Sequence, residues 1–413
     1  MIETLVNIYI ALYPIAPGYF KIFGFDSGVV LSFLFCIIYI FFKGKSHLRI
    51  KKSHLSIVGV FLLLMLLPLI FHGEITRLVR VIFEYGITLL ILMDYFDSER
   101  KIDKAINILI IVATIMCFFG IYESLFGKNF FTFLFNGSEL DLTPDLQMRG
   151  AFARSETTFG HAIPYAIYLS IVGLLTSYNC FVNKDRRYLF SYILIVLNIV
   201  LSISRAPIIV FFISQVLLLY LAGLKTFVRT IGRIMVAIIL LTLFVSWMSP
   251  SFLNSITSMV TMVLAVFSEN AAQQIGYITN ANPFTYRIEL IKVLPQYFEG
   301  HIIFGHGDSE RITFNMLGHS YYSVDNSYLA WTLKYGIIGL IGNVIPIVKT
   351  IKSSIKYRDK NPVFIAFISI GVCYMLNLFA VAQLGEYKIW IIVLSLVFSY
   401  MNLYRTKKLC DGV

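Results

Sequence analysis

Long apolar segments recur along the whole of this chain, and short polar loops separate them. Many approach the roughly 20 residues that a helix needs to cross a hydrocarbon layer about 30 Å thick. An α-helix satisfies its backbone polar groups within one segment, as a bilayer requires. We expect helices near 4–22, 28–43, 54–72, 77–95, 104–126, 161–178, 188–204, 206–224, 231–248, 327–348, 363–383 and 387–404. The chain is therefore predicted to be an all-α, polytopic membrane protein, a single transmembrane domain over residues 1–413 with about 12 spanning helices.

The composition supports a membrane protein and argues against a nucleic-acid partner. Hydrophobic residues make up 58% of the 413 residues and charged residues only 14%, which is too little polar surface for a soluble domain of this size. The aromatic content of 15% suits contact with membrane lipid. The net charge of +11 would suit nucleic acid, but the basic residues cluster in short loops between apolar segments.

The basic clusters occupy alternate loops, which is typical of the cytoplasmic side of membrane proteins. They lie at 43–52, 100–104, 184–187, 225–233, 349–360 and 405–408. This arrangement predicts cytoplasmic termini. The opposite side then carries two long loops, 127–160 and 249–326. The amphipathic stretch 286–298 predicts short helices at the membrane surface within the second loop. Long loops with structure of their own are usually functional.

Arginines are scarce on the side of the long loops, so each one is informative. Among them are Arg77, Arg80, Arg149, Arg154, Arg205 and Arg287. Guanidinium groups gathered from several segments could grip a phosphate or pyrophosphate, because their fork matches the phosphate oxygens. The alternative is that each arginine reaches the interface or pairs with an acidic neighbour, as Arg80 could with Glu84 four residues on. Arg205 has no acidic residue near it in sequence.

Acid–base candidates lie in the same loops. They are Asp325, His319, Glu156, His161, His301 and His306. Asp325 could equally cap the helix that follows it, and a lone histidine is more often structural. The five cysteines have neither disulfide nor metal-site spacing, and no acidic metal cluster is evident, so no metal and no cofactor are expected. The segment GHGDSERIT at 305–313 is only a weak match to a phosphate-binding loop.

Four segments together resemble a known family, the O-antigen ligase and polymerase superfamily of bacterial polysaccharide assembly. They are MRGAFARSETTFGHAIPYAIYL at 148–169, LSISRAPII at 201–209, TYRIELIKVLPQYFEGHIIFGHG at 285–307 and DNSYLAWTLKYGIIGLIG at 325–342. In ligases of this family a histidine usually precedes the asparagine of the fourth segment, whereas this chain has Asp325 before Asn326. That form is more similar to the repeat-unit polymerases, and His319 is the alternative base.

The resemblance implies a metal-independent glycosyltransferase in the bacterial cytoplasmic (inner) membrane, with its active face in the periplasm. A polymerase would transfer a glycan from undecaprenyl pyrophosphate onto a lipid-linked repeat unit of O-antigen, capsule or exopolysaccharide. A ligase would transfer the glycan to lipid A-core instead. A chain-length regulator and a flippase of the same pathway are the implied protein partners.

The expected site has three groups of residues. Arg149, Arg154, Arg205 and Arg287 would hold the pyrophosphate, with Arg77 and Arg80 in reserve. Asp325 or His319, followed by Glu156, would act as the base. His161, Asn326 and Tyr328 would complete the pocket. A third reading, a transporter of lipid-linked oligosaccharide, would require ionisable residues at the bilayer midplane, where only Lys334 and Glu84 are candidates.

Overall fold

The computed structural model describes most of the chain and is almost entirely helical there. The described residues are 1–43, 52–134, 146, 148–149, 152–232, 289–307, 312–316, 319–321, 324–379, 381 and 387–410. Most of the expected ninth helix at 231–248, and the first part of the second long loop, lie outside them.

The helices follow the apolar segments closely. Their bounds are α1 (Ile2–Leu12), α2 (Ser27–Lys43), α3 (Lys52–Phe71), α4 (Ile75–Val79), α5 (Thr88–Tyr95), α6 (Glu99–Phe126), α7 (Ala162–Ser177), α8 (Leu189–Leu201), α9 (Arg205–Leu221), α14 (Ser327–Tyr357), α15 (Val363–Asn377) and α16 (Tyr387–Cys410). Short 3₁₀ helices are η1 (Tyr13–Ile15), η3 (Phe130–Leu134), η4 (Thr157–Phe159), η6 (Arg186–Tyr188) and η7 (Leu294–Phe298), and π-helical turns are η2 (Arg80–Ile87) and η5 (Tyr178–Val182).

Residues 224–232 are also helical, and the described residues form three small antiparallel hairpins. They pair β1 (Lys21–Ile22) with β2 (Phe25–Asp26), β3 (Met148–Arg149) with β4 (Phe152–Ala153), and β5 (Phe314–Met316) with β6 (His319–Tyr321). Residues 289–293 are helical and lead into η7, so the part of the amphipathic stretch that the structure describes is helical, as predicted.

A helical membrane protein is confirmed in outline, although the number of spanning helices is not. Within the described residues four helices are long and apolar enough to cross a membrane: Glu99–Phe126, Ala162–Val182, Ser327–Tyr357 and Tyr387–Arg405. Shorter apolar helices are Ile2–Ile15, Ser27–Lys43, Val58–Phe71, Arg205–Leu221 and Val363–Asn377.

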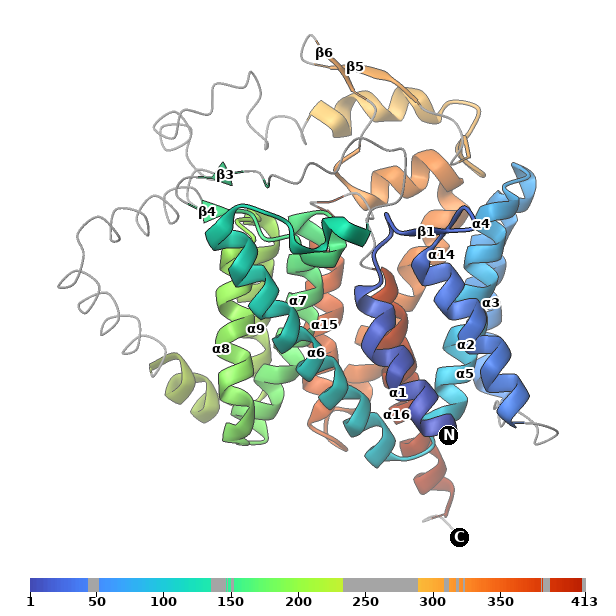
Figure 1. The fold of residues 1–413 in the computed structure, drawn as a ribbon. Coiled ribbons are helices and arrows are strands. Elements are labelled where there is room, and N and C mark those ends of the chain that lie inside the picture. Colours follow the sequence, from blue (N-terminus) through green and yellow to red (C-terminus); the bar gives the residue numbers. More distant parts are fainter. Residues whose placement is uncertain are drawn as a thin grey trace.

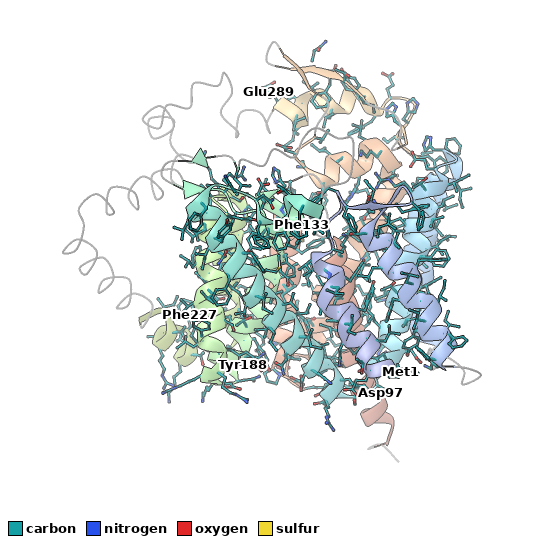
Figure 2. The ribbon with its side chains drawn as sticks, in the orientation of Figure 1. Met1, Asp97, Phe133, Tyr188, Phe227 and Glu289 are labelled. Carbon is teal, nitrogen blue, oxygen red and sulfur yellow. The ribbon has the colours of Figure 1, made fainter. Side chains whose placement is uncertain are left out.

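The long helices run side by side, and both chain termini lie at one end of them (Figure 1). The hairpins and the described parts of both long loops lie at the opposite end, as the charge pattern requires. In Figure 2 Met1, Asp97 and Tyr188 mark the terminal end, whereas Phe133 and Glu289 mark the loop end. We call this second end the loop face. Helix α14 packs against α3 and α15, and α7 packs against α8 and α9.

The first helix is shorter than expected. The apolar run predicted a helix over 4–22, but α1 ends at Leu12 and η1 ends at Ile15. Pro14 and Pro17 lack a backbone N–H and cannot continue the hydrogen-bonding pattern, so the chain leaves the helix there. The next residues turn back through the β1–β2 hairpin at the loop face.

Candidate active site

A buried carboxylate fastens the first long loop to the end of α6. The Glu123 side chain is fully buried, and one of its oxygens accepts the backbone N–H groups of Glu156 at 2.9 Å and Thr157 at 2.8 Å. Its other oxygen accepts the N–H of Phe130 at 3.2 Å. The neighbouring Ser124 hydroxyl donates to the carbonyl of Ala153 at 3.0 Å. The segment 153–157 is therefore held against α6 by three hydrogen bonds to two adjacent side chains, Glu123 and Ser124.

From this segment the Arg154 side chain reaches the turn between α8 and α9. Its guanidinium Nε donates to the Ser202 carbonyl at 3.3 Å, and Nη2 donates to the Ser204 hydroxyl at 3.0 Å. The Arg154 side chain is only 5% exposed. Arg205 follows Ser204 directly, begins α9 and is partly exposed. Two of the predicted arginines, from separate parts of the sequence, are thus brought to one place.

Two residues of these segments adopt an unusual backbone conformation. Thr157 has φ of 49° and Ile203 has φ of 48°, in the left-handed region that glycine normally occupies. Each such residue costs on the order of 1–3 kcal/mol and persists only where surrounding contacts impose it. For Thr157 one such contact is the hydrogen bond from its N–H to Glu123. Strained backbone of this kind is concentrated at functional sites.

Glu156 adds an acid–base group beside the arginines. Its side chain is half-buried, and this burial raises the pKa of the carboxyl group above its usual range, while the Arg154 charge opposes the rise. Tyr19, in the loop after η1, lies close enough to feel the charges of both glutamates. Burial and then the Glu123 and Glu156 charges raise the pKa of its phenol. Tyr19 and Glu123 were not predicted from the sequence.

His161 caps helix α7 next to this segment. Its Nδ1 accepts the backbone N–H of Ile163 at 3.2 Å, so in the neutral ring the proton is on Nε2. The predicted place of His161, at the start of a helix on the loop face, is confirmed.

The remaining predicted arginines differ in their locations and partners. Arg149 pairs in register with Phe152 in the β3–β4 hairpin, and Phe152 stands two residues before Arg154. Arg287 lies outside the described residues. Arg80 forms ion pairs with Asp26 of β2 and, at 3.3 Å, with Glu84. The acidic pairing that the sequence offered as the alternative for Arg80 is therefore confirmed, whereas Arg77 lies partly buried on α4.

Arg80 belongs to a buried ionic network at the loop face. Lys21 also pairs with Asp26, and the Lys388 ammonium donates to the Ala16 carbonyl at 2.5 Å. The Lys388 Nζ and a Glu84 oxygen each lie 2.9 Å from the position that a Cβ on Gly28 would occupy. Gly28 leaves the space in which these charged groups meet.

At the start of α14 the cap is Asn326, and Asp325 lies just before it. The Asn326 side chain accepts the N–H of Leu329 at 3.2 Å, so the helix is capped by Asn326 and not by Asp325. Asp325 is exposed at the loop face. The Tyr328 hydroxyl donates to the Met375 carbonyl at 2.8 Å, which ties α14 to α15. His319 lies in β6, where it pairs in register with Met316.

The glycine-rich segment 304–307 fills a break in α14 and is not arranged as a phosphate loop. Helix α14 is interrupted at Gly336, where φ is 66° and ψ is −168°. The N–H groups of His306 and Gly307 donate to the carbonyls of Leu333 and Lys334, each at 2.9 Å. A Cβ on Gly336 would lie 2.1 Å from the Ile303 carbonyl oxygen. The N–H groups of His306 and Gly307 are therefore engaged with α14, whereas residues 308–311 of the candidate phosphate loop lie outside the described residues.

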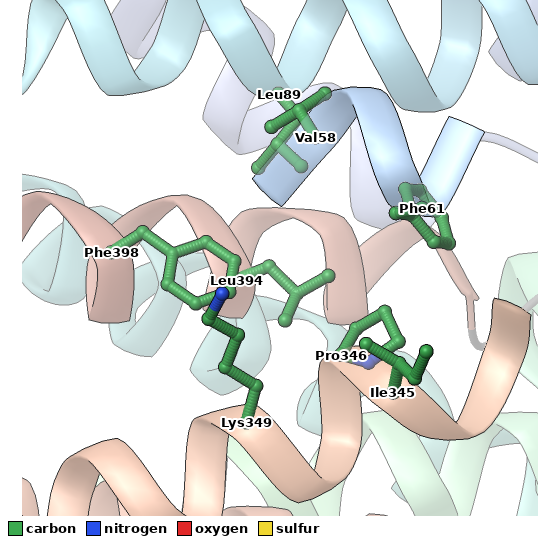
Figure 3. Close-up of a pocket in the computed structure, with 8 residues that line it drawn as sticks. All are labelled: Val58, Phe61, Leu89, Ile345, Pro346, Lys349, Leu394 and Phe398. Atoms are coloured by element: carbon green, nitrogen blue, oxygen red, sulfur yellow. The ribbon is translucent and has the colours of Figure 1, made fainter. Parts of the chain in front are cut away.

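One apolar pocket lies within the helix bundle. It is lined by Val58 and Phe61 of α3, Leu89 of α5, Lys349 of α14 and Phe398 of α16, among others (Figure 3). It contains none of the predicted site residues. Within the described part of the chain, no three His, Cys, Asp or Glu side chains are grouped so that they could hold a metal ion.

Glu123 left a faint signal in the sequence. It is a carboxylate in the last turn of α6, after a long run without charged residues, where a negative charge is unfavourable for the helix dipole. An acidic residue in that position needs a partner from elsewhere, and here the partner is the backbone of the following loop. No motif spacing points to it.

Comparison with known proteins places part of this site within a family. No curated protein matches the chain. A family model described as O-antigen ligase matches residues 190–344, which include the Ser202–Arg205 turn, the Asp325–Asn326 pair and the break at Gly336. The match over residues 190–344 is consistent with the O-antigen polymerase and ligase superfamily.

Proposed function

We propose that this protein is a polysaccharide polymerase of the bacterial inner membrane, with its loop face in the periplasm and its termini in the cytoplasm. Its donor is a glycan on undecaprenyl pyrophosphate, and its acceptor is a lipid-linked repeat unit of O-antigen, capsule or exopolysaccharide. The observation that carries the proposal is the junction of Arg154 with Ser204, directly before Arg205, at the loop face of a membrane protein with an O-antigen ligase family domain.

The proposed reaction exchanges one bond for another. The oxygen of an acceptor sugar hydroxyl attacks the anomeric carbon of the donor, and the bond from that carbon to the pyrophosphate oxygen breaks. The bonding electrons leave with undecaprenyl pyrophosphate, whose negative charge grows during departure. Arg205 would stabilise that charge, with Arg149 and Arg287 as further candidates, because preorganised cations lower the barrier to charge development.

The acceptor proton requires a base. The candidates are Asp325, His319 and Glu156. We assign the role of base to Glu156, because the charge of Arg154 acts on the pKa of its carboxyl group. General-base catalysis typically contributes about 10²–10⁴-fold to the rate. Arg154 itself is buried in contact with the α8–α9 turn, so we assign it the role of holding Arg205 in place. His161, Asn326 and Tyr328 lie at the loop-face ends of α7 and α14 and support the site by fixing those ends.

The second candidate is a ligase that transfers the same donor to lipid A-core, and the description of the matched family favours it. The two are separated by giving purified protein lipid-linked repeat units alone, in the presence of EDTA. We expect a ladder of lengthening glycans without lipid A-core and without a divalent metal. A strict requirement for the core acceptor would establish the ligase. Dependence on a divalent ion would overturn the metal-independent mechanism.

A further inference from the structure

We propose that Glu123 is a positioning residue of the transferase site: its carboxylate, through the backbone of residues 156–157, holds the segment that carries Arg154 against the turn that carries Arg205. This inference rests on the proposed function for its catalytic consequence. Its structural part, the hold on residues 153–157, stands on the hydrogen bonds alone.

The geometry around Glu123 demands a carboxylate. All three of its described hydrogen-bond partners are backbone N–H groups, those of Phe130, Glu156 and Thr157, and they are shared between both oxygens. An ionised carboxylate is an acceptor at both oxygens, whereas an amide is an acceptor at one atom and a donor at the other. A glutamine in this place must turn its NH₂ group toward at least one N–H, which replaces an attraction with a donor–donor contact.

The hold extends from Glu123 to Arg205 in two steps. The Glu123 carboxylate fixes the backbone at Glu156 and Thr157, including the left-handed conformation of Thr157. The same segment then reaches the α8–α9 turn through the Arg154 side chain and through the Ser155 N–H, which donates to the Leu201 carbonyl at 3.4 Å. Loss of the first contact should therefore change the position of the second.

A buried carboxylate would be costly if it served no purpose. Burial of an unpaired charge is strongly unfavourable, and hydrogen bonds to a charged group repay part of that cost. All the described hydrogen bonds of the Glu123 oxygens go to backbone N–H groups of the loop that follows α6, so they stabilise the loop conformation.

The test compares Glu123→Gln with a matched control, Glu3→Gln. Glu3 is an exposed carboxylate in α1 that pairs with Lys104, and Met1, two residues before it, lies at the opposite end of the molecule (Figure 2). We expect Glu123→Gln to lower kcat for chain extension on the order of 10²-fold, with a smaller change in KM, because misplacement by about 1 Å has this effect on rate. The Glu3→Gln variant should extend chains at the unmodified rate.

A double-mutant cycle with Arg205→Lys separates positioning from general instability. If Glu123 acts through the Arg205 turn, the double variant loses less activity than the product of the two single losses, because the residues belong to one network. Multiplicative losses would overturn the proposal. If Glu123→Gln fails to accumulate, Ser124→Ala loosens the same segment through one neutral hydrogen bond, and the same cycle is measured with it.

Hydrogen exchange provides a readout that does not depend on activity. The amides of Glu156 and Thr157 should exchange faster in Glu123→Gln than in Glu3→Gln, and unchanged exchange would overturn the proposal. If the unmodified protein extends no lipid-linked repeat, the proposed function fails. The exchange rates would still decide whether Glu123 holds the loop.

Discussion

The buried guanidinium of Arg154 donates a hydrogen bond to the hydroxyl of Ser204, the residue immediately before Arg205. This contact joins the first long loop to the turn between α8 and α9. Arg154 also donates to the Ser202 carbonyl, so one side chain spans the turn. Arg205 therefore begins α9 directly after a turn that the Arg154 side chain holds, and under the proposed function it would there face the negatively charged leaving group.

Replacement of Arg205 should abolish most of the activity without affecting folding. We expect Arg205→Ala to lower kcat on the order of 10²–10³-fold, as loss of one preorganised charge-stabilising group does. Arg205→Lys should also be impaired, because a point charge does not reproduce the bidentate grip of a guanidinium. The measurement is ladder formation from lipid-linked repeats at equal membrane abundance. Arg187→Ala is the control, since Arg187 is exposed and pairs with Asp185 on the terminal side. Full ladders from Arg205→Ala would contradict the proposed role.

The pH dependence of chain extension should report Glu156. Burial raises the pKa of its carboxyl group, so the group takes up a proton at a higher pH than an ordinary glutamate. A protonated Glu156 cannot accept the acceptor proton, and the rate should therefore fall on the acid side with a midpoint above the usual pKa of about 4.3. The Glu156→Gln variant should extend chains slowly and should lack this acid limb. The control variant Glu299→Gln changes an exposed glutamate and should keep the acid limb. An identical acid limb in Glu156→Gln, with its loss in Asp325→Asn or His319→Ala, would reassign the base.

Gly336→Ala should destabilise the protein. Alanine would have to adopt a φ of 66°, and its Cβ would lie 2.1 Å from the Ile303 carbonyl oxygen. Left-handed strain alone costs on the order of 1–3 kcal/mol, and the backbone clash adds to it. The measurement is thermal unfolding of the purified protein in detergent. Gly59→Ala, on α3 with open space around its Cβ position, should unfold at the original temperature. Equal unfolding temperatures for the two variants would show that the break in α14 can move.

The ionic network around Glu84 should respond to single and paired substitutions differently. Glu84 is 3% exposed, and Glu84→Gln would leave the buried Lys388 and Arg80 with too little negative charge. Breaking a buried pair in this way costs about 3–5 kcal/mol. Adding Lys388→Met should recover part of the loss, because it removes the uncompensated cation. Glu289→Gln, which affects only a surface pair with Lys292, serves as the control. Additive losses from Glu84→Gln and Lys388→Met would contradict the network.

Local features allowed much of the architecture to be predicted. The length of each apolar run predicted a helix, and the basic clusters predicted which side carries the long loops. Both features can be read from a single segment of the chain. The pairing of Arg80 with Glu84 was foreseen for the same reason, since four residues on a helix bring the side chains together. The end of α1 was placed too late, because Pro14 and Pro17 stand in a run that is otherwise apolar.

By itself, the sequence determined that this chain is a helical membrane protein and that its basic clusters lie opposite the two long loops, because hydrophobic length and charge are properties of each segment alone. Only the tertiary structure decided which arginines meet. In the structure Arg154 contacts the turn before Arg205, and Arg80 pairs with Asp26. The Glu123 carboxylate accepts hydrogen bonds from the backbone of the loop that follows α6. These contacts depend on the packing of helices that are distant in sequence, and no spacing within one segment can encode them.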